Sequence, residues 1–278
     1  MGRLKSFIIL SRPLNVIIGM LSIFIGAFIT GTISPLLKVL FACLSGGLIA
    51  GGANVINDYY DIEIDKINKP HRPIAAGLIT QKEGFTYSLI LYFVGIFFGW
   101  LVNWQALAVS IFSSALLFLY SAKLKRTVLW GNLSVSLVTA LAFIYGGIAV
   151  NRLSYAIIPA VFSFVYHLGR EIIKDVEDVE GDKADNINTF PIKFGEIPAL
   201  KLATMVYLIL IIFTIIPYVL KIFGVYYLII LIGVVDLVVM YVLFSMWKNY
   251  QSGHLSRLSI ILKLNMFAGL VAIYLGKF

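Results

Sequence analysis

Long apolar stretches constrain the fold of this chain more than any other feature of its sequence. Of its 278 residues, 60% are hydrophobic and only 13% are charged, whereas an average soluble domain is about 25% charged. A helix needs roughly 17–25 mostly apolar residues to cross the hydrocarbon core of a bilayer. The sequence therefore predicts an all-α integral membrane protein and excludes a soluble globular domain.

Nine apolar stretches are close enough to bilayer length to be read as membrane spans. The fourth is the shortest, and the ninth carries Lys263 near its start. We therefore expect nine transmembrane helices in one bundle, with cytoplasmic helical loops that cap it. The predicted spans are residues 14–30, 36–56, 84–102, 105–120, 128–149, 154–173, 200–220, 225–246 and 258–276.

The basic residues indicate how the chain is oriented in the membrane. If the amino terminus is cytoplasmic, 18 of the 22 Lys and Arg residues lie on the cytoplasmic side. The four on the outside are Lys38, Arg152, Lys221 and Lys277. Cytoplasmic loops carry an excess of Lys and Arg, so we expect a multi-pass protein of the cell membrane with a cytoplasmic amino terminus. The net charge of +8 is spread over short loops, which argues against nucleic-acid binding.

Six aspartates fall in two short clusters with the same spacing. The clusters are Asp58, Asp61 and Asp65, and Asp175, Asp178 and Asp182. Positions i, i+3 and i+7 of a helix lie near one face, so each cluster is expected to present three carboxylates to one point. Such a group is costly to desolvate without a cation, and Mg²⁺ binds to a few carboxylates together with water and substrate phosphates. The clusters predict one cytoplasmic Mg²⁺ site built from two halves.

The two clusters also suggest an internal repeat. A shift of 117 residues places the first cluster on the second and the second predicted span on the sixth. No linker or soluble segment divides the sequence. We therefore expect a single transmembrane domain over residues 1–278, with a repeat that relates residues 58–65 to residues 175–182.

Basic residues stand next to both acidic clusters. Carboxylates, metal ions and Lys or Arg side chains together suit the binding of a diphosphate. The alternative is that these cations only orient loops and contact lipid headgroups. Asn54, one helical turn before the first cluster, is either a polar residue of the site or a helix-packing amide. The neighbouring cations are Lys69, Arg72, Lys123, Lys125, Arg126, Arg170 and Lys174.

Four motifs in chain order resemble those of the UbiA superfamily of intramembrane prenyltransferases. Residues 57–65 are similar to its N-D-x-x-D-x-x-x-D motif, and residues 170–182 to its second motif, which ends in D-x-x-x-D. Residues 120–123 (YSAK) resemble its Y-x-x-K motif, and residues 12–15 (RPLN) its R-P-x-N motif. The resemblance covers essentially the whole chain and implies a UbiA-like bundle.

The resemblance also implies a chemistry and a role for each matching residue. In the family mechanism, Mg²⁺ ions, which we expect to number two here, bridge the diphosphate of a polyprenyl donor. The donor's C–O bond then ionises to an allylic carbocation, which an acceptor captures. The residues that match its metal sites are Asn57, Asp61, Asp65, Asp178 and Asp182. Asp58 and Asp175 match positions that bind metal or orient the acceptor, and they complete the catalytic set. The matches to substrate-binding positions are Arg12, Asn15, Arg72, Tyr120, Lys123 and Lys174.

Residues 65–74 and 169–178 look most like the archaeal members of the superfamily that build glycerol lipids. This implies transfer of a geranylgeranyl group from geranylgeranyl diphosphate to the secondary hydroxyl of geranylgeranylglyceryl phosphate. A phosphate-bearing acceptor would use further cations, for which Lys125, Arg126 and Arg170 are the candidates. The alternatives are prenylation of an aromatic acceptor for quinone, haem or chlorophyll synthesis, and a cation-coupled transporter. Carboxylates at span ends argue against the transporter, because coupling sites lie near the midplane.

Overall fold

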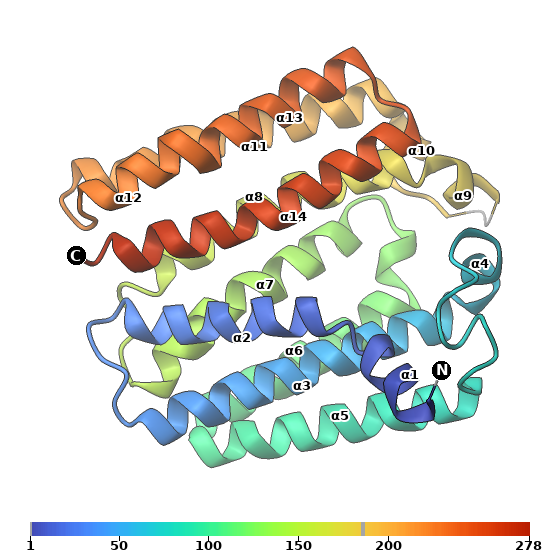
Figure 1. The fold of residues 1–278 in the computed structure, drawn as a ribbon, viewed down its shortest axis with the longest axis horizontal. Helices are drawn as coiled ribbons and strands as arrows, with labels where there is room; N and C mark the ends of the chain where they lie inside the picture. The colour runs from blue at the N-terminus through green and yellow to red at the C-terminus, as the bar shows by residue number, and fades with distance from the viewer. Residues whose placement is uncertain (1, 185–186) are drawn as a thin grey trace. The chain divides into compact units, whose positions relative to one another are not determined.

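The computed structural model of the protein describes residues 2–184 and 187–278, and the regular secondary structure in these ranges is helical throughout (Figure 1). The helices are α1 (Arg3–Leu10), α2 (Pro13–Phe28), α3 (Leu36–Tyr60), α4 (Ile62–Asn68), α5 (Gln81–Val102), α6 (Trp104–Ala122), α7 (Trp130–Ala149), α8 (Ile157–Glu177), α9 (Val179–Ala184), α10 (Phe190–Phe194), α11 (Glu196–Val219), α12 (Val225–Ile230), α13 (Leu237–Lys248) and α14 (Ser252–Leu275). A 3₁₀ turn, η1 (Leu124–Arg126), follows α6, and a π-helical stretch, η2 (Leu231–Asp236), joins α12 to α13.

The helices confirm the predicted membrane class, and each predicted span falls on a helix or on the run from α12 to α13. Among the described residues, seven such segments are long and apolar enough to cross a membrane. They include the fourth and ninth predicted spans, α6 and α14. The helices α1 and α2, bent by 49° at their junction, give an eighth if they count as one span. The predicted number of nine is therefore not confirmed in full.

The remaining predicted span coincides with α8, which differs from the others in its second half. Arg170, Glu171, Lys174 and Asp175 interrupt the apolar sequence there. Charged residues are costly in the hydrocarbon core of a bilayer. The 21-residue helix therefore joins an apolar first half to a charged end that carries the second acidic cluster.

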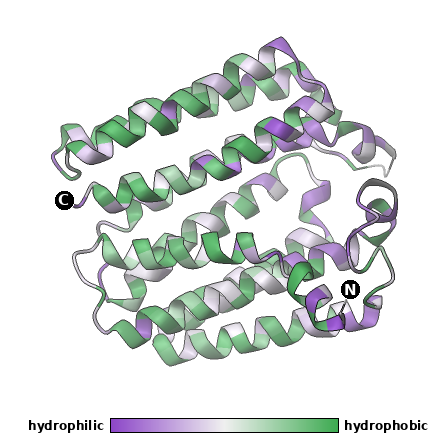
Figure 2. Cartoon of the chain, in the orientation of Figure 1, coloured by the Kyte–Doolittle hydropathy of each residue, from purple (hydrophilic) through white to green (hydrophobic). Residues whose placement is uncertain are grey.

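Large apolar side chains are exposed on the membrane-length helices. On α5, Phe93 is 74% exposed and Trp100 is 59% exposed. Figure 2 shows hydrophobic residues along most of α5, whereas hydrophilic residues gather at its beginning and at the beginning of α1. Apolar surface of this extent marks an interaction with a membrane or a partner. Together with the helix lengths, it identifies the chain as a multi-pass membrane protein.

Two compact units make up the fold. Unit 1 comprises Met1–Lys125 and Leu141–Ile157, and unit 2 comprises Arg126–Ala140 and Ile158–Phe278. In unit 1, α3 packs against α2, α5 and α6. A Cβ atom on Gly26 would clash with the backbone of Phe143, and one on Gly146 with the backbone of Ile23. Glycine therefore lets α2 and α7 approach each other directly, as small residues do between membrane helices.

Unit 2 has its own core, which α8, α11, α13 and α14 form. Ile173, Tyr207, Met246 and Leu255 are among its fully buried side chains. The Asn265 side chain on α14 donates a hydrogen bond of 3.0 Å to the carbonyl oxygen of Val235 in η2. This side chain therefore supplies a partner for the backbone where the α-helical pattern changes.

Candidate active site

Both acidic clusters lie where a long helix ends and a short one begins. Asp61 is the residue between α3 and α4, and Asp178 is the residue between α8 and α9. Asp61 has φ −98° and ψ 9°, which lies outside the regular α-helical pattern. The three carboxylates of a cluster therefore do not lie on one continuous helix, as the i, i+3, i+7 argument assumed, because the helix ends at the middle carboxylate of each cluster.

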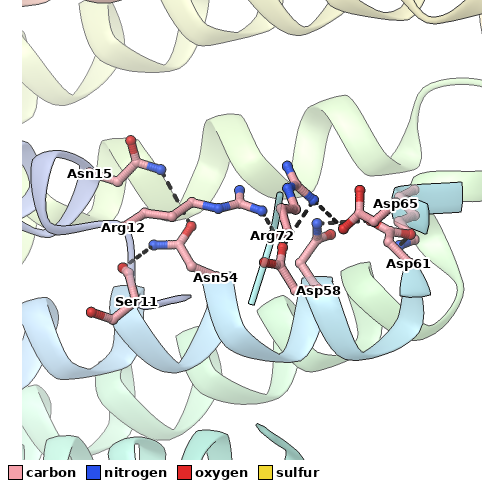
Figure 3. Close-up of polar contacts among 10 residues, drawn as sticks. Ser11, Arg12, Asn15, Asn54, Asp58, Asp61, Asp65 and Arg72 are labelled. Atoms are coloured by element: carbon pink, nitrogen blue, oxygen red, sulfur yellow. Dashed lines mark hydrogen bonds and ion pairs between the residues drawn. The ribbon is translucent and has the colours of Figure 1, made fainter. Parts of the chain in front are cut away.

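One arginine nevertheless joins two carboxylates of the first cluster. Arg72 Nη1 donates hydrogen bonds to Asp58 Oδ1 at 3.0 Å and to Asp65 Oδ2 at 2.5 Å (Figure 3). The two carboxylate side chains are only 4% and 5% exposed. Buried carboxylates need a cation or several hydrogen bonds in place of water. Arg72 thus neutralises this pair and fixes its geometry.

A second arginine reaches the same carboxylate from the break between α1 and α2. Arg12 has φ 53°, in the left-handed region, and Pro13 begins α2 directly after it. The Arg12 guanidinium forms an ion pair with Asp58, and Figure 3 shows it extended along the site toward this carboxylate. Asp58 therefore ties the break between α1 and α2 to the end of α3 and to Arg72.

The polar residues predicted beside Arg12 also meet in the structure. Asn54 Nδ2 on α3 donates to the carbonyl oxygen of Ser11 at 2.9 Å, and Asn15 Nδ2 donates to Asn54 Oδ1 at 3.4 Å. These contacts attach the start of α2 to α3. Asn54 lies beside the cluster and also links helices, so both of the roles expected for it fit its position.

Asp61 has a separate set of partners. Asn57 Nδ2, one turn earlier on α3, donates to Asp61 Oδ2 at 2.9 Å. Lys125 on η1 forms an ion pair with Asp61 Oδ1. The Lys123 side chain, which the Y-x-x-K pattern singled out, is exposed, and Tyr120 is partly buried in the last turn of α6. Lys125 therefore contacts the first acidic cluster directly.

The second cluster, in unit 2, combines a carboxylate, an amide and two cations. Asn132 Nδ2 on α7 donates to Asp175 Oδ2 at 2.8 Å. Arg170 and Lys174 lie 2.8 Å and 3.7 Å from the carboxylate oxygens of Glu171. Asp175 lies just beyond the sixth predicted span. Removal from water raises the pKa of its carboxyl group to about 8, and the Asn132 hydrogen bond opposes this rise. The buried Asp175 carboxylate is therefore more stable when a proton or a bound cation neutralises its charge.

The other predicted residues of unit 2 lie near this cluster in the sequence but have individual partners. Thr189 Oγ1 donates to Asp182 Oδ2 at 3.4 Å. The backbone N–H of Asn188 donates to the carbonyl oxygen of Arg126, whose side chain is exposed. Arg170 Nε also donates to the carbonyl oxygen of Ser259 at 3.5 Å.

Sequence reasoning missed Asn132 and Glu171 as members of the site. Glu171 falls inside the second motif but outside its three-aspartate spacing, and it is 7% exposed. Asn132 lies in the fifth predicted span, 43 residues from its partner Asp175. A polar residue in an apolar span is a signal of function or of helix contact, and this signal could have indicated Asn132.

The donor atoms fit an open Mg²⁺ site rather than a closed metal cage. No group of three His, Cys, Asp or Glu side chains close enough to hold a metal exists among the described residues. Mg²⁺ usually keeps several waters and binds through one or two carboxylates plus substrate phosphates. Asp61 with Asn57 in unit 1, and Asp178 and Asp182 in unit 2, supply oxygen ligands of the required kind.

Comparisons with known proteins agree with the motifs. The digeranylgeranylglyceryl phosphate synthase of Methanosphaera stadtmanae is 34% identical over 273 residues, which cover 98% of this chain and 99% of that protein. A solved structure of a digeranylgeranylglyceryl phosphate synthase matches with a TM-score of 0.80 and 34% identity, covering 100% of this chain and 99% of that one. A solved UbiA homolog from Archaeoglobus fulgidus bound to GPP and Mg²⁺ has a TM-score of 0.74 at 21% identity, covering 96% and 99%, and shows the fold.

The family model of the UbiA prenyltransferase family matches residues 19–267. This match spans most of the sequence and includes both acidic clusters. It confirms the resemblance that the four motifs indicated. The chain belongs to the UbiA prenyltransferase family.

Proposed function

We propose that this prenyltransferase moves a geranylgeranyl group from geranylgeranyl diphosphate to the secondary hydroxyl of geranylgeranylglyceryl phosphate, as in archaeal ether-lipid synthesis. The similarity over 98% of the chain to a digeranylgeranylglyceryl phosphate synthase carries this proposal. In the reaction, the C–O bond to the donor diphosphate breaks, a C–O bond to the acceptor oxygen forms, and the hydroxyl proton leaves.

The ionic contacts support a division of roles within the first cluster. Asn57, Asp61 and Asp65 would hold Mg²⁺, which when bound neutralises charge on the diphosphate as it departs. Asp58 would act mainly by orienting Arg12 and Arg72, because both guanidiniums bind it. Asp178 and Asp182 would hold a second ion, with Asp175 beside them. We assign both clusters to one donor diphosphate on the strength of their shared motif pattern.

The basic residues would bind the two phosphate-bearing substrates. Arg72, Lys123, Lys174 and the Tyr120 hydroxyl are assigned to the donor diphosphate, because they match the family motifs. Of the three candidates for the acceptor phosphate, we retain Arg126 and Arg170. We set Lys125 aside because it pairs with Asp61, a residue assigned to the donor side of the site. The apolar spans would shield the allylic cation from water, which is a general requirement for such a reaction.

We also propose that units 1 and 2 act as one prenyltransferase domain with an internal repeat. The shift of 117 residues that superimposes the clusters also carries the last residue of α3 onto that of α8, and the first residue of α4 onto that of α9. Each unit thus contributes one acidic cluster at an equivalent helix junction. If α3–α4 and α8–α9 could not be superimposed in an experimental structure, the repeat would be excluded.

A panel of acceptors tests the proposed function directly. Purified protein with Mg²⁺ and geranylgeranyl diphosphate is expected to prenylate geranylgeranylglyceryl phosphate and to leave 4-hydroxybenzoate unchanged. Arg170→Gln should raise the acceptor KM about tenfold to a hundredfold, since one charge-assisted phosphate contact contributes about 1.5–3 kcal/mol. The donor KM should change much less. Prenylation of the aromatic acid alone would replace the lipid assignment with the aromatic one.

The charge distribution supports an active site that opens to the cytoplasm in the cell membrane. Cysteine labelling on intact cells, in a Cys43→Ser background, measures this orientation, because Cys43 is the only cysteine. Lys183→Cys should be protected from an impermeant reagent and Arg152→Cys should be labelled. Both native side chains are exposed, so protection reports the membrane side. Labelling at position 183 but not at position 152 would reverse the orientation.

A further inference from the structure

Lys125 occupies the carboxylate that the proposed function assigns to Mg²⁺. The Lys125 ammonium pairs with Asp61 Oδ1, and the Asn57 amide donates to Asp61 Oδ2 at 2.9 Å. Both oxygens are therefore engaged before any metal binds. An ammonium and a divalent cation on the same carboxylate repel each other strongly at such short range. Lys125 and Mg²⁺ thus compete for Asp61.

The other two carboxylates of the cluster are more deeply buried than Asp61. The Asp61 side chain is 16% exposed, compared with 4% for Asp58 and 5% for Asp65. One nitrogen of Arg72 donates hydrogen bonds to both of these buried carboxylates. A guanidinium is a rigid fork, whereas a lysine ammonium is a point charge on a flexible chain. Lys125 is therefore the cation of the cluster best suited to change partners.

The position of Lys125 also limits where it can move. It lies in η1, the 3₁₀ turn that follows α6, and its side chain is only 10% exposed. Its flexible stem allows the ammonium to shift by a few ångströms while it stays within the site. An anion bound beside Asp61 would therefore be within its reach.

We propose that Lys125 is an exchangeable counter-ion that couples metal binding to donor binding. It neutralises Asp61 in the free enzyme, leaves this carboxylate when Mg²⁺ binds, and then pairs with the donor diphosphate. This inference rests on the proposed function, because it takes Asp61 as a metal ligand. Each ligand then favours the other, and by linkage the coupling is the same in both directions.

Titration calorimetry of Mg²⁺ into the purified full-length protein, without donor, tests the competition. Lys125→Gln is expected to bind Mg²⁺ about tenfold more tightly than the wild type, because its competing charge is gone. Lys82→Gln removes the same charge from an exposed side chain at the start of α5 and should leave the affinity unchanged. Lys125→Arg should bind Mg²⁺ more weakly, because a guanidinium holds a carboxylate with two donors.

The coupling is measured by repeating the titration with a thiolo analogue of geranylgeranyl diphosphate, which ionises slowly. The analogue should tighten Mg²⁺ binding in the wild type and do so much less in Lys125→Gln. Unchanged or weaker Mg²⁺ binding by Lys125→Gln, with Asp61→Asn losing the metal, would overturn the inference alone. If Asp61→Asn bound Mg²⁺ as the wild type does, the proposed metal site itself would fail. If Lys125→Gln were not recovered folded, tight binding by Lys125→Arg would overturn the inference.

Discussion

Asp61→Asn is expected to lower kcat/KM at least about a thousandfold, a loss of roughly 4 kcal/mol of transition-state stabilisation. The substitution keeps the size of the side chain and an oxygen for the Asn57 hydrogen bond. It removes the charge that pairs with Lys125 and that the proposed function assigns to Mg²⁺. Initial rates with both substrates at saturating Mg²⁺ measure the effect, and the variant should still be extracted from the membrane as a folded protein.

Glu63→Gln is the matched control for this prediction. It makes the same change from carboxylate to amide two residues away, where the side chain is 78% exposed and pairs with Lys66 on the surface. Surface ion pairs contribute little, so activity should stay within about twofold of the wild type. Excess EDTA should reproduce the loss in the wild type, and Mg²⁺ should restore activity. Retention of more than about a tenth of the activity by Asp61→Asn would remove Asp61 from the metal site.

Arg72→Gln is expected to damage both stability and turnover. Arg72 is the shared partner of Asp58 and Asp65, whose side chains are almost completely buried. Breaking a buried ion pair by removing one partner costs about 3–5 kcal/mol, because the other charge remains buried. Thermal unfolding in detergent should show a large decrease in melting temperature, and kcat/KM should fall at least about a hundredfold.

Two further variants separate this effect from a general loss of positive charge. Arg257→Gln makes the same substitution at an exposed side chain and should leave stability and rate nearly unchanged. Asp65→Asn in the Arg72→Gln background removes the carboxylate charge that Arg72 no longer neutralises, whereas Asp58 keeps Arg12. It should restore part of the stability without restoring activity. Such non-additivity is expected of residues in one ion-pair network. Equal melting temperatures for Arg72→Gln and Arg257→Gln would contradict the role given to Arg72.

The sequence was sufficient to predict the helices because apolar length is a local property. The same is true of the spacing of the carboxylates in each cluster. Their partners were less accessible, since Arg12 lies 46 residues from Asp58 and Lys125 lies 64 residues from Asp61. No local pattern specifies such pairs, which the packing of α2, α3 and η1 creates. The break at Asp61 was missed for a related reason, because helical periodicity does not show where a helix ends without a Gly or Pro signal.

The ion pairs of unit 1 leave its acidic cluster balanced in charge before any ligand binds. Three basic side chains, Arg12, Arg72 and Lys125, face three carboxylates. A diphosphate that arrived alone would add several negative charges to a poorly hydrated site, at a high electrostatic cost. A diphosphate that arrives with its divalent cations changes the net charge far less. If the cluster binds the donor as proposed, it would select for the neutralised complex, so metal and donor would behave as one ligand.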